Sequence, residues 1–302
     1  MVETRLGKIK IALNLLVADF LFKINSTVPF DYSNSFLAHF VLENSKTIDC
    51  SIQISTENFT YKTAEKVFSA NANFEDNYLI NNYYWEVFNS ENHKYFIIFE
   101  KENNKAIVKA QFSEKADNWK IFLNKDYYNN TKNIFPYPCF HLILYYFLEA
   151  QNCLMMHASG VYKLGNKAIL FSGFSGAGKS TISRIFSENK YQLINDDRLV
   201  LRKIDNSWKV YNTPMFYKEK PQSASLFKLF LISHGKKNEA HKLSGASALA
   251  SLLAFCLQHN YDSKIVQKNI GLVNDLLQNT AIYNLAFLPD NSVVNFIEKL
   301  DE

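Results

Sequence analysis

Short runs of alternating apolar and polar residues fill the first 130 positions of the chain. Clusters of Asn, Ser and Glu separate these runs, as is typical of β-strands joined by turns. The clearest runs are SIQIS (51–55), YWEVF (84–88), KYFIIFE (94–100), KAIVKAQF (105–112) and WKIFL (119–123). The pattern predicts an antiparallel β-rich amino-terminal region over residues 1–135.

The apolar period changes after residue 135. An apolar stretch of helix length follows Pro136 and Pro138 and ends near Gln151, which predicts a connecting helix over 136–152. From residue 153 onward strand-like and helix-like segments alternate, with long helical patterns at about 242–258 and 262–280. We therefore expect a fold of the α+β or α/β class, with a second domain over 153–302 built on a mixed sheet.

The stretch GFSGAGKST, residues 173–181, fits the phosphate-binding pattern G-x-x-x-x-G-K-[ST]. Five of the nine glycines in the chain fall between 160 and 178, which indicates a local purpose for them. Glycine lets the backbone turn through positive φ, so that successive N–H groups can surround phosphate oxygens. The expected phosphate cradle consists of Gly173, Phe174, Ser175, Gly176, Ala177, Gly178, Lys179, Ser180 and Thr181.

The segments around this loop have the strand–loop–helix order that the motif requires. KAILFS (167–172) is an apolar run before the loop, and Ile182, Ile185 and Phe186 share one helix face after it. Residues 155–173 read as a β-hairpin that turns at 164–166. The strand before the loop strand is therefore expected to be antiparallel to it, unlike the helical crossovers of the commonest nucleotide-binding fold.

Two carboxylates follow the loop in LINDD, where Asp196 lies seventeen positions after Lys179 and Asp197 is next to it. One carboxylate beside a dication can stay ionised on the metal while the other accepts a proton. A solvated turn after a strand is the alternative interpretation of this pair. His157 lies in an apolar strand, where a core histidine and a functional one are equally compatible with the pattern.

The stretch HASGVYKLGNKAILFSGFSGAGKST, followed by YQLINDDRLVLR and NTP, resembles the catalytic domain of HPr kinase/phosphorylase and its smaller relatives. These proteins share a core with ATP-dependent phosphoenolpyruvate carboxykinase. The resemblance runs from Met155 to the end of the chain. The amino-terminal half is more similar to the variable leader of the shorter relatives.

The resemblance implies a role for each matching residue. Lys179 would contact the β- and γ-phosphates, and Ser180 and Asp197 would hold Mg²⁺. Asp196 would be the general base and His157 would lie near the transferred phosphate, although the division of roles between Asp196 and Asp197 stays open. The implied cofactors are ATP, or another nucleoside triphosphate, and Mg²⁺. Such proteins often form homo-oligomers, and no heptad pattern here indicates a number of subunits.

Some residues depart from the family pattern. Thr181 stands where family kinases usually carry Glu, so the number of metal ions stays open. The RGLG-type signature and the Arg-rich loop associated with protein-substrate binding are not found, and HPr itself is not the expected substrate. The arginines after position 150 are Arg184, Arg198 and Arg202, of which Arg184 and Arg202 are interpreted as surface residues.

Composition narrows the class of partner. The 33 basic and 29 acidic residues are mixed along the chain and leave a net charge of +4, so we expect no nucleic-acid partner. The four cysteines are far apart and form no C-x-x-C pair, which indicates reduced core thiols. Asp19 interrupts the apolar start of the chain, and no apolar run is long enough for a bilayer, so no membrane role and a cytoplasmic location are expected.

The sequence thus predicts an ATP-dependent, Mg²⁺-assisted kinase that phosphorylates a hydroxyl group of a peptide, protein or small molecule. The alternative is a nucleotide-binding sensor or scaffold that transfers no phosphate. His234 and His241 are interpreted as residues of a solvated loop, and Lys218 and Lys220 as residues of a charged surface turn.

Overall fold

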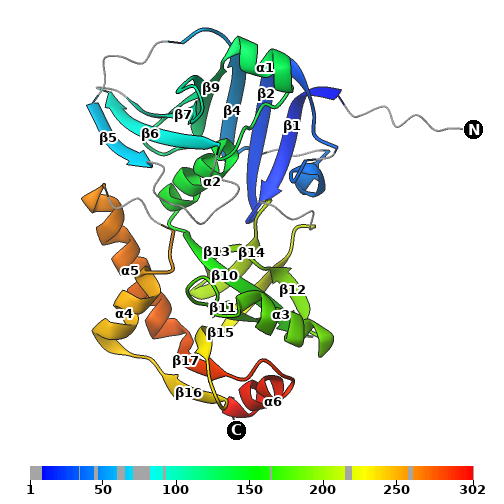
Figure 1. The fold of residues 1–302 in the computed structure, drawn as a ribbon, viewed down its shortest axis with the longest axis vertical. Coiled ribbons are helices and arrows are strands. Elements are labelled where there is room, and N and C mark those ends of the chain that lie inside the picture. Colours follow the sequence, from blue (N-terminus) through cyan, green and yellow to red (C-terminus); the bar gives the residue numbers. More distant parts are fainter. Residues whose placement is uncertain are drawn as a thin grey trace, which may run out of the picture. The chain divides into compact units, whose positions relative to one another are not determined.

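A computed structural model describes residues 9–33, 35–43, 47–59, 65–70, 82–90, 93–163, 165–214, 220–257 and 261–301. The chain forms two compact units (Figure 1). Unit 1 comprises Met1–Gln151 with Pro214–Lys218, and unit 2 comprises Asn152–Thr213 with Glu219–Glu302.

Unit 1 is built on a nine-stranded sheet with the strand order β3-β1-β2-β4-β9-β8-β7-β6-β5. The strands are β1 (Ile9–Val17), β2 (Phe20–Asp31), β3 (Val41–Leu42), β4 (Cys50–Thr56), β5 (Glu65–Ala70), β6 (Tyr83–Ser90), β7 (His93–Glu100), β8 (Ala106–Phe112) and β9 (Asn118–Leu123). The expectation of an antiparallel region was incomplete, because β4 pairs in parallel with both β2 and β9. Parallel neighbours begin at the same end of the sheet, so the chain returns to that end before it enters β4 and again before it enters β9.

One face of this sheet carries the core of unit 1. Helix α2 (Cys139–Ala150) packs its aromatic side chains on it: Phe147 contacts Phe22 with ring centroids 4.8 Å apart, and Tyr146 contacts Phe112 at 4.7 Å. Every α2 residue from Cys139 to Leu148 is buried. A short helix α1 (Lys125–Thr131) precedes it and was not expected from the sequence.

Unit 2 holds the second, eight-stranded sheet, which mixes parallel and antiparallel pairs. Its strands are β10 (Leu154–Lys163), β11 (Lys167–Ser172), β12 (Gln192–Asn195), β13 (Arg198–Ile204), β14 (Ser207–Asn212), β15 (Ser223–His234), β16 (Glu239–Lys242) and β17 (Ala281–Phe287). Its helices are α3 (Lys179–Glu188), α4 (Gly245–Leu253), α5 (Ser263–Asn279) and α6 (Ser292–Glu298). The mixed sheet with its helices confirms the predicted fold class.

Apolar cores lie on both faces of the unit 2 sheet because its strands alternate large side chains between the faces. Leu170 of β11 packs in one core with Leu252 and Val273 of the helices α4 and α5. Phe171, the next residue, packs in the other core with Ile182 of α3 and Val293 of α6. The strand before the loop is thus fixed on both sides.

Strand β11 leads into the loop of residues 173–178 and lies between the strands β10 and β15. It pairs antiparallel with β10, from Ala158 opposite Ser172 to Lys163 opposite Lys167, which confirms the predicted hairpin; Leu164 of its turn lies outside the described residues. On its other side β11 pairs in parallel with β15, and β15 pairs in parallel with β17. The carboxyl ends of β11, β15 and β17 therefore lie at one edge of the sheet, where ligands of such sheets bind.

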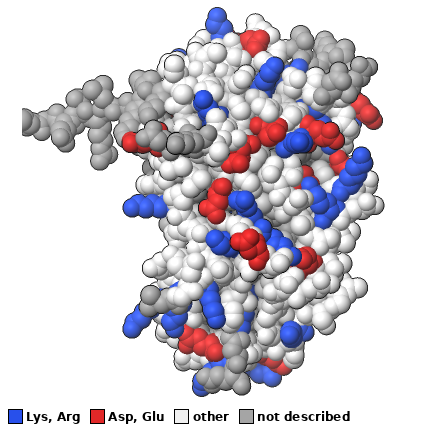
Figure 2. Space-filling view, turned by 180° about the vertical axis from the view of Figure 1, so that it is seen from behind, with Lys and Arg blue, Asp and Glu red and all other residues white. Residues whose placement is uncertain are grey.

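Two surface properties bear on the partners of the chain. Within the described segments, no helix combines the length and apolar character needed to cross a bilayer. Basic and acidic side chains are interspersed on the face shown in Figure 2.

Candidate phosphate-binding site

The loop between β11 and α3 depends on its glycines at three points. Gly176 and Gly178 have φ angles of 78° and 96°, in the left-handed region that side chains other than glycine rarely adopt. A Cβ atom on Gly173 would lie 2.9 Å from the carbonyl oxygen of Ile232 in β15. The motif glycines are thus required by the backbone and by its close approach to β15.

Lys179, the first residue of α3, is 9% exposed and folds back over the loop. Its Nζ atom donates to the carbonyl oxygens of Gly173, at 2.9 Å, and Phe174, at 3.3 Å. Burial lowers the pKa of Lys179, while the nearby Asp197 and Asp196 oppose that shift. The ammonium group therefore lies directly beside the loop whose N–H groups are suited to phosphate.

Asp196 follows β12 and contacts the start of α3. Ser183 Oγ donates to Asp196 Oδ1 at 3.4 Å, and the side-chain hydroxyl of Ser180 lies near the same carboxylate. Burial raises the pKa of Asp196, the two serine hydroxyls lower it, and Asp197 raises it further. The loop serine and the first carboxylate thus form a neighbouring pair of oxygen donors.

Asp197 points to a different set of partners. Its Oδ1 atom lies 3.4 Å from His157 Nε2 in β10, and its Oδ2 atom lies 3.6 Å from Arg198 Nε. Burial lowers the pKa of His157, as do Lys179 and Arg198, while Asp197 raises it. The structure therefore brings together the residues singled out in the sequence, with Asp196 on the helix side and Asp197 on the histidine side.

Asn195 holds the acidic pair in place and was missed in the sequence. Its Oδ1 atom accepts from the backbone N–H groups of Asp196, at 2.6 Å, and Asp197, at 3.3 Å. Asn195 is 1% exposed, and its Nδ2 atom has no hydrogen-bond partner among the described residues. An Asn directly before two carboxylates is the signal that could have found this turn.

His234 was wrongly placed in a solvated loop, since it ends strand β15 beside the phosphate loop. Its Nε2 atom lies 2.8 Å from the carbonyl oxygen of Gly176, and its ring stacks on Phe287 with centroids 6.2 Å apart. A Cβ atom on Gly178 would meet the same Phe287 ring at 2.9 Å. The long strand continues to His234 because β17 pairs with it up to that residue.

A cavity of about 470 Å³ opens beside the loop, and its strand residues come from β15, β16 and β17. Phe174 of the loop is 76% exposed and meets Phe255 edge-on, with ring centroids 5.0 Å apart. Ser233, Asn284 and Glu239 add polar groups to the wall. The cavity thus lies on the β15 side of β11, whereas the acidic pair lies on the β10 side.

The other sequence candidates lie as follows. Ser175 is exposed, Ala177 donates its N–H to the Phe174 carbonyl at 3.1 Å, and Thr181 is half-buried on α3. His241 lies in β16, which was expected to be a loop, and pairs with Glu239 at 3.1 Å. Lys220 is exposed, whereas Lys218 lies outside the described residues.

The donors at the loop fit Mg²⁺. This ion is bound in proteins by one or two carboxylates together with substrate phosphates and water. Ser180 and Asp196 offer a hydroxyl and a carboxylate near each other at the amino end of α3. In the described part of the chain, no group of three or more His, Cys, Asp or Glu residues forms an all-protein metal site.

Comparisons with known proteins place the chain in a family. The family model described as phosphoenolpyruvate carboxykinase matches residues 21–214. The match begins in unit 1, well before Met155, and ends at residue 214, so that residues 215–302 of the chain lie outside it. A solved structure of an Hpr(Ser) kinase/phosphatase from Coxiella burnetii is similar, with 11% sequence identity over 49% of this chain and 99% of that one and a TM-score of 0.30. No curated protein matches the chain.

Proposed function

Because the chain belongs to the phosphoenolpyruvate carboxykinase family, we propose that unit 2 binds a nucleoside triphosphate with Mg²⁺ and transfers its terminal phosphoryl group to a hydroxyl group. Family membership confirms the resemblance expected from the sequence and implies a nucleotide-using, kinase-like activity. The hydroxyl acceptor, on a peptide, a protein or a small molecule, is the finer part of the proposal. The placement of Asp196 at the start of α3, near Ser180 and beside the loop lysine, is the observation that carries it.

The loop and Lys179 would hold the phosphates. Phosphoryl transfer needs positioning and charge neutralisation more than covalent help. Lys179 Nζ donates to two neutral carbonyl groups of its own loop, so a swing of this side chain toward the β- and γ-phosphates would exchange them for acceptors that carry negative charge. The left-handed glycines turn the loop so that backbone N–H groups can face the same anion.

We assign the metal to Asp196 rather than to Asp197, the reverse of the roles first expected. Ser180, the loop residue suited to Mg²⁺, lies near Asp196 and lowers the pKa of its carboxyl group. Mg²⁺ would neutralise charge on the transferred group. A dication beside Asp196 favours the ionised carboxylate and opposes the upward pKa shift that burial causes.

Asp197 and His157 would then face the acceptor. Asp197 would accept the hydroxyl proton, because its carboxylate lies beside His157, whereas Asp196 lies beside Ser180 and Ser183. His157 Nε2 is 3.4 Å from Asp197 Oδ1 and would orient that atom. A positioned base of this kind contributes typically about 10²–10⁴-fold to the rate. Arg198 Nε, 3.6 Å from Oδ2, holds the other carboxylate oxygen.

The cavity of about 470 Å³ would take the nucleoside. Its size falls within the range of small-molecule sites, about 300–1,000 Å³. Phe174 and Phe255 provide aromatic surface for a base, and Asn284 and Ser233 provide hydrogen-bonding groups. With the nucleoside on the β15 side, the γ-phosphate would point to the acidic pair on the β10 side.

A second candidate is a nucleotide-binding sensor that transfers no phosphate. Thr181, where family kinases usually carry Glu, is the residue that favours it. Without that Glu, the site would still bind a nucleotide, but it would lack one carboxylate ligand for a second metal ion.

The test measures Mg·ATP binding by calorimetry and γ-phosphoryl transfer in the same samples, with peptide, protein and small-molecule hydroxyl acceptors supplied as an extract. Lys179→Ala should weaken binding at least about tenfold, because it removes a charge-assisted contact. The matched control is Lys264→Ala, an exposed lysine in the first turn of α5, and it should bind like the wild type.

The two aspartates separate the proposed roles. Asp197→Asn should keep nucleotide binding and lower transfer by at least about 100-fold. Asp196→Asn should raise the Mg²⁺ concentration needed for transfer. Nucleotide binding without transfer to any acceptor would favour the sensor, and transfer that depends on oxaloacetate would point to the carboxykinase reaction instead.

A further inference from the structure

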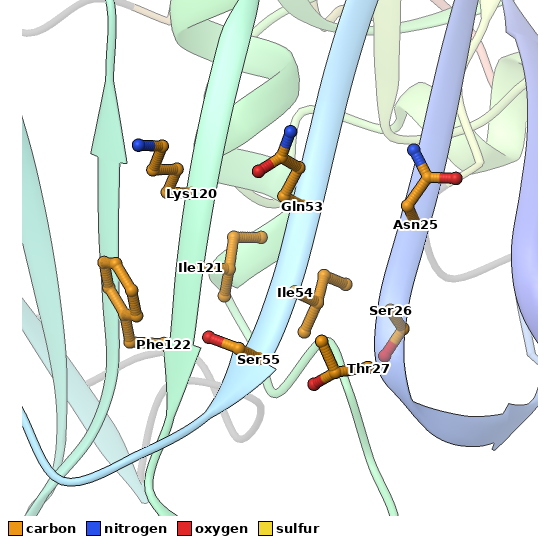
Figure 3. Close-up of a pocket in the computed structure, with 9 residues that line it drawn as sticks. All are labelled: Asn25, Ser26, Thr27, Gln53, Ile54, Ser55, Lys120, Ile121 and Phe122. Carbon is orange, nitrogen blue, oxygen red and sulfur yellow. The ribbon is translucent and has the colours of Figure 1, made fainter.

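The solvent-exposed face of the unit 1 sheet carries a polar trough. Two adjoining hollows of about 310 Å³ and 240 Å³ share Gln53 and Lys120 as lining residues. The first hollow lies over β2, β4 and β9, as Figure 3 shows, and the second extends it over β8. We call these joined hollows the unit 1 trough.

One cross-strand row forms the floor of the trough. Asn25 lies opposite Gln53, Gln53 lies opposite Lys120, and Lys120 lies opposite Gln111. Opposite residues project to the same face of a sheet, and Figure 3 shows Asn25, Gln53 and Lys120 side by side. Neighbouring strands are about 4.8 Å apart, so the row spans roughly 14 Å, the length of about four residues of extended chain.

The polar groups of this row are not used by the described parts of the protein. The side-chain amides of Asn25, Gln53 and Gln111 have no hydrogen-bond partner among the described residues, and Lys120 forms no ion pair there. By contrast, the hydroxyl of Ser55 at the margin already donates to Glu57 at 3.0 Å. The row thus offers donors and acceptors of both kinds to a ligand.

The charge on the trough is of one sign. Lys23, Lys120 and Lys109 occupy this face on three strands, and neither hollow has an Asp or Glu among its lining residues. The carboxylates described nearest to it already have partners: Asp117 bonds to Ser113 and Asn118, and Glu57 to Ser55, while Glu86 of β6, farther along the same face, pairs with Lys66. A ligand that carries a carboxylate over Lys120 would therefore meet no like charge in the trough.

We propose that the unit 1 trough binds an extended acidic peptide segment of four to five residues, with one carboxylate placed at Lys120. Each peptide unit has one N–H donor and one C=O acceptor, and the side-chain amides offer the same two kinds of group. Single-stranded nucleic acid fits less well, because it requires exposed aromatic platforms, whereas the aromatic lining residues of the trough are half-buried (His93, Phe122) or buried (Phe112, Trp119). This site is independent of the phosphate-binding loop.

The test uses the ¹⁵N-labelled full-length chain and the peptide acetyl-GSGEGSG-amide, with acetyl-GSGKGSG-amide as the opposite-charge probe. Transverse-relaxation-optimised NMR spectra report on the side-chain NH₂ groups of Asn25, Gln53 and Gln111. The acidic probe should shift these signals saturably and bind roughly fivefold more tightly than the basic one, and added salt should reduce the difference.

Lys120→Glu should reverse the preference, so that the basic probe binds more tightly. Lys125→Glu is the matched control, because Lys125 is exposed at the start of α1 and lies outside the trough. It should leave the preference of the wild type unchanged. The proposal is overturned if neither peptide shifts the three NH₂ signals at millimolar concentration, if both bind equally, or if oligothymidylate binds in their place.

Discussion

Replacement of Gly178 by Ala tests the backbone of the phosphate loop most directly. Gly178 has a φ of 96°, and a Cβ atom there would lie 2.9 Å from Phe287 Cζ. The left-handed conformation costs a residue other than glycine about 1–2 kcal/mol. Overpacking against a fixed ring costs about 1–3 kcal/mol more. Gly178→Ala should therefore destabilise unit 2 by about 2–5 kcal/mol.

Two matched variants separate these contributions. Gly165 has a φ of 99°, and a Cβ atom there would have open space within 4 Å, so Gly165→Ala carries the strain alone. Gly271 lies inside α5 with the same free space, so Gly271→Ala should stabilise the protein by about 0.5–1 kcal/mol. The series thus contains two substitutions that should lower the stability of the protein and one that should raise it.

The assay is calorimetric unfolding of the four proteins. A loss of 1 kcal/mol lowers Tm by about 2–4 °C in a domain of about 150 residues, so Gly178→Ala should melt roughly 4–20 °C below the wild type. The double variant Gly178→Ala/Phe287→Leu should show a favourable coupling energy, because the shorter side chain makes room. Equal Tm values for Gly178→Ala and Gly165→Ala, together with no coupling to Phe287, would refute the reasoning.

Three further predictions concern single contacts in the described chain. Asp275→Ala should destabilise unit 2 by about 1–3 kcal/mol in urea unfolding, because Asp275 accepts from the buried Trp208 Nε1 at 3.0 Å and pairs with Lys203 at 2.6 Å; Asp205→Ala, in an exposed turn, is the comparison. Hydrogen bonds from Lys163 and Tyr191 lower the pKa of Glu298 below its ordinary value of 4.5, so its stabilisation is present above pH 4.5 and is lost as the pH falls through the lowered pKa. Glu298→Gln should thus flatten the acid limb of the stability profile, and an unchanged limb would contradict this. Burial raises the pKa of Cys153 and Cys256 to about 12, and raises those of Cys50 and Cys139 as well, so the native protein at pH 8 should react with a thiol reagent only as fast as it unfolds.

The sequence predicted unit 2 more fully than unit 1. Strands β13 (RLVLRKI) and β17 (AIYNLAF) lie in the stretch from residue 153 onward, where strand-like and helix-like segments were predicted to alternate. The parallel pairing of β4 in unit 1 was missed, because alternation within a strand reports which face is buried and not the direction of its neighbour. Strand order is set by contacts between distant segments.

The candidate site shows the same division. Lys179, Ser180 and the two aspartates were found because the spacing of a local motif fixes them. His234 and Asn195 were missed, since their roles depend on contacts that local sequence does not encode: His234 meets Gly176, 58 positions away in the chain, and Asn195 acts through two backbone N–H groups. Parallel pairing of β11 with β15 is what brings His234 to the loop.

The hydrogen bonds between β10 and the segment after α4 have a thermodynamic consequence. The N–H of His157 donates to the Phe255 carbonyl at 3.0 Å, and the N–H of Leu257 donates to the Met155 carbonyl at 2.7 Å. Phe255 belongs to the cavity wall, whereas His157 belongs to the flank of Asp197. A ligand that moves Phe255 would also move or break its hydrogen bond to the backbone of His157. By reciprocity, a ligand that moves His157 would affect the backbone of Phe255 to the same energetic extent. Occupancy on one side of the loop and geometry on the other are therefore coupled through two main-chain hydrogen bonds.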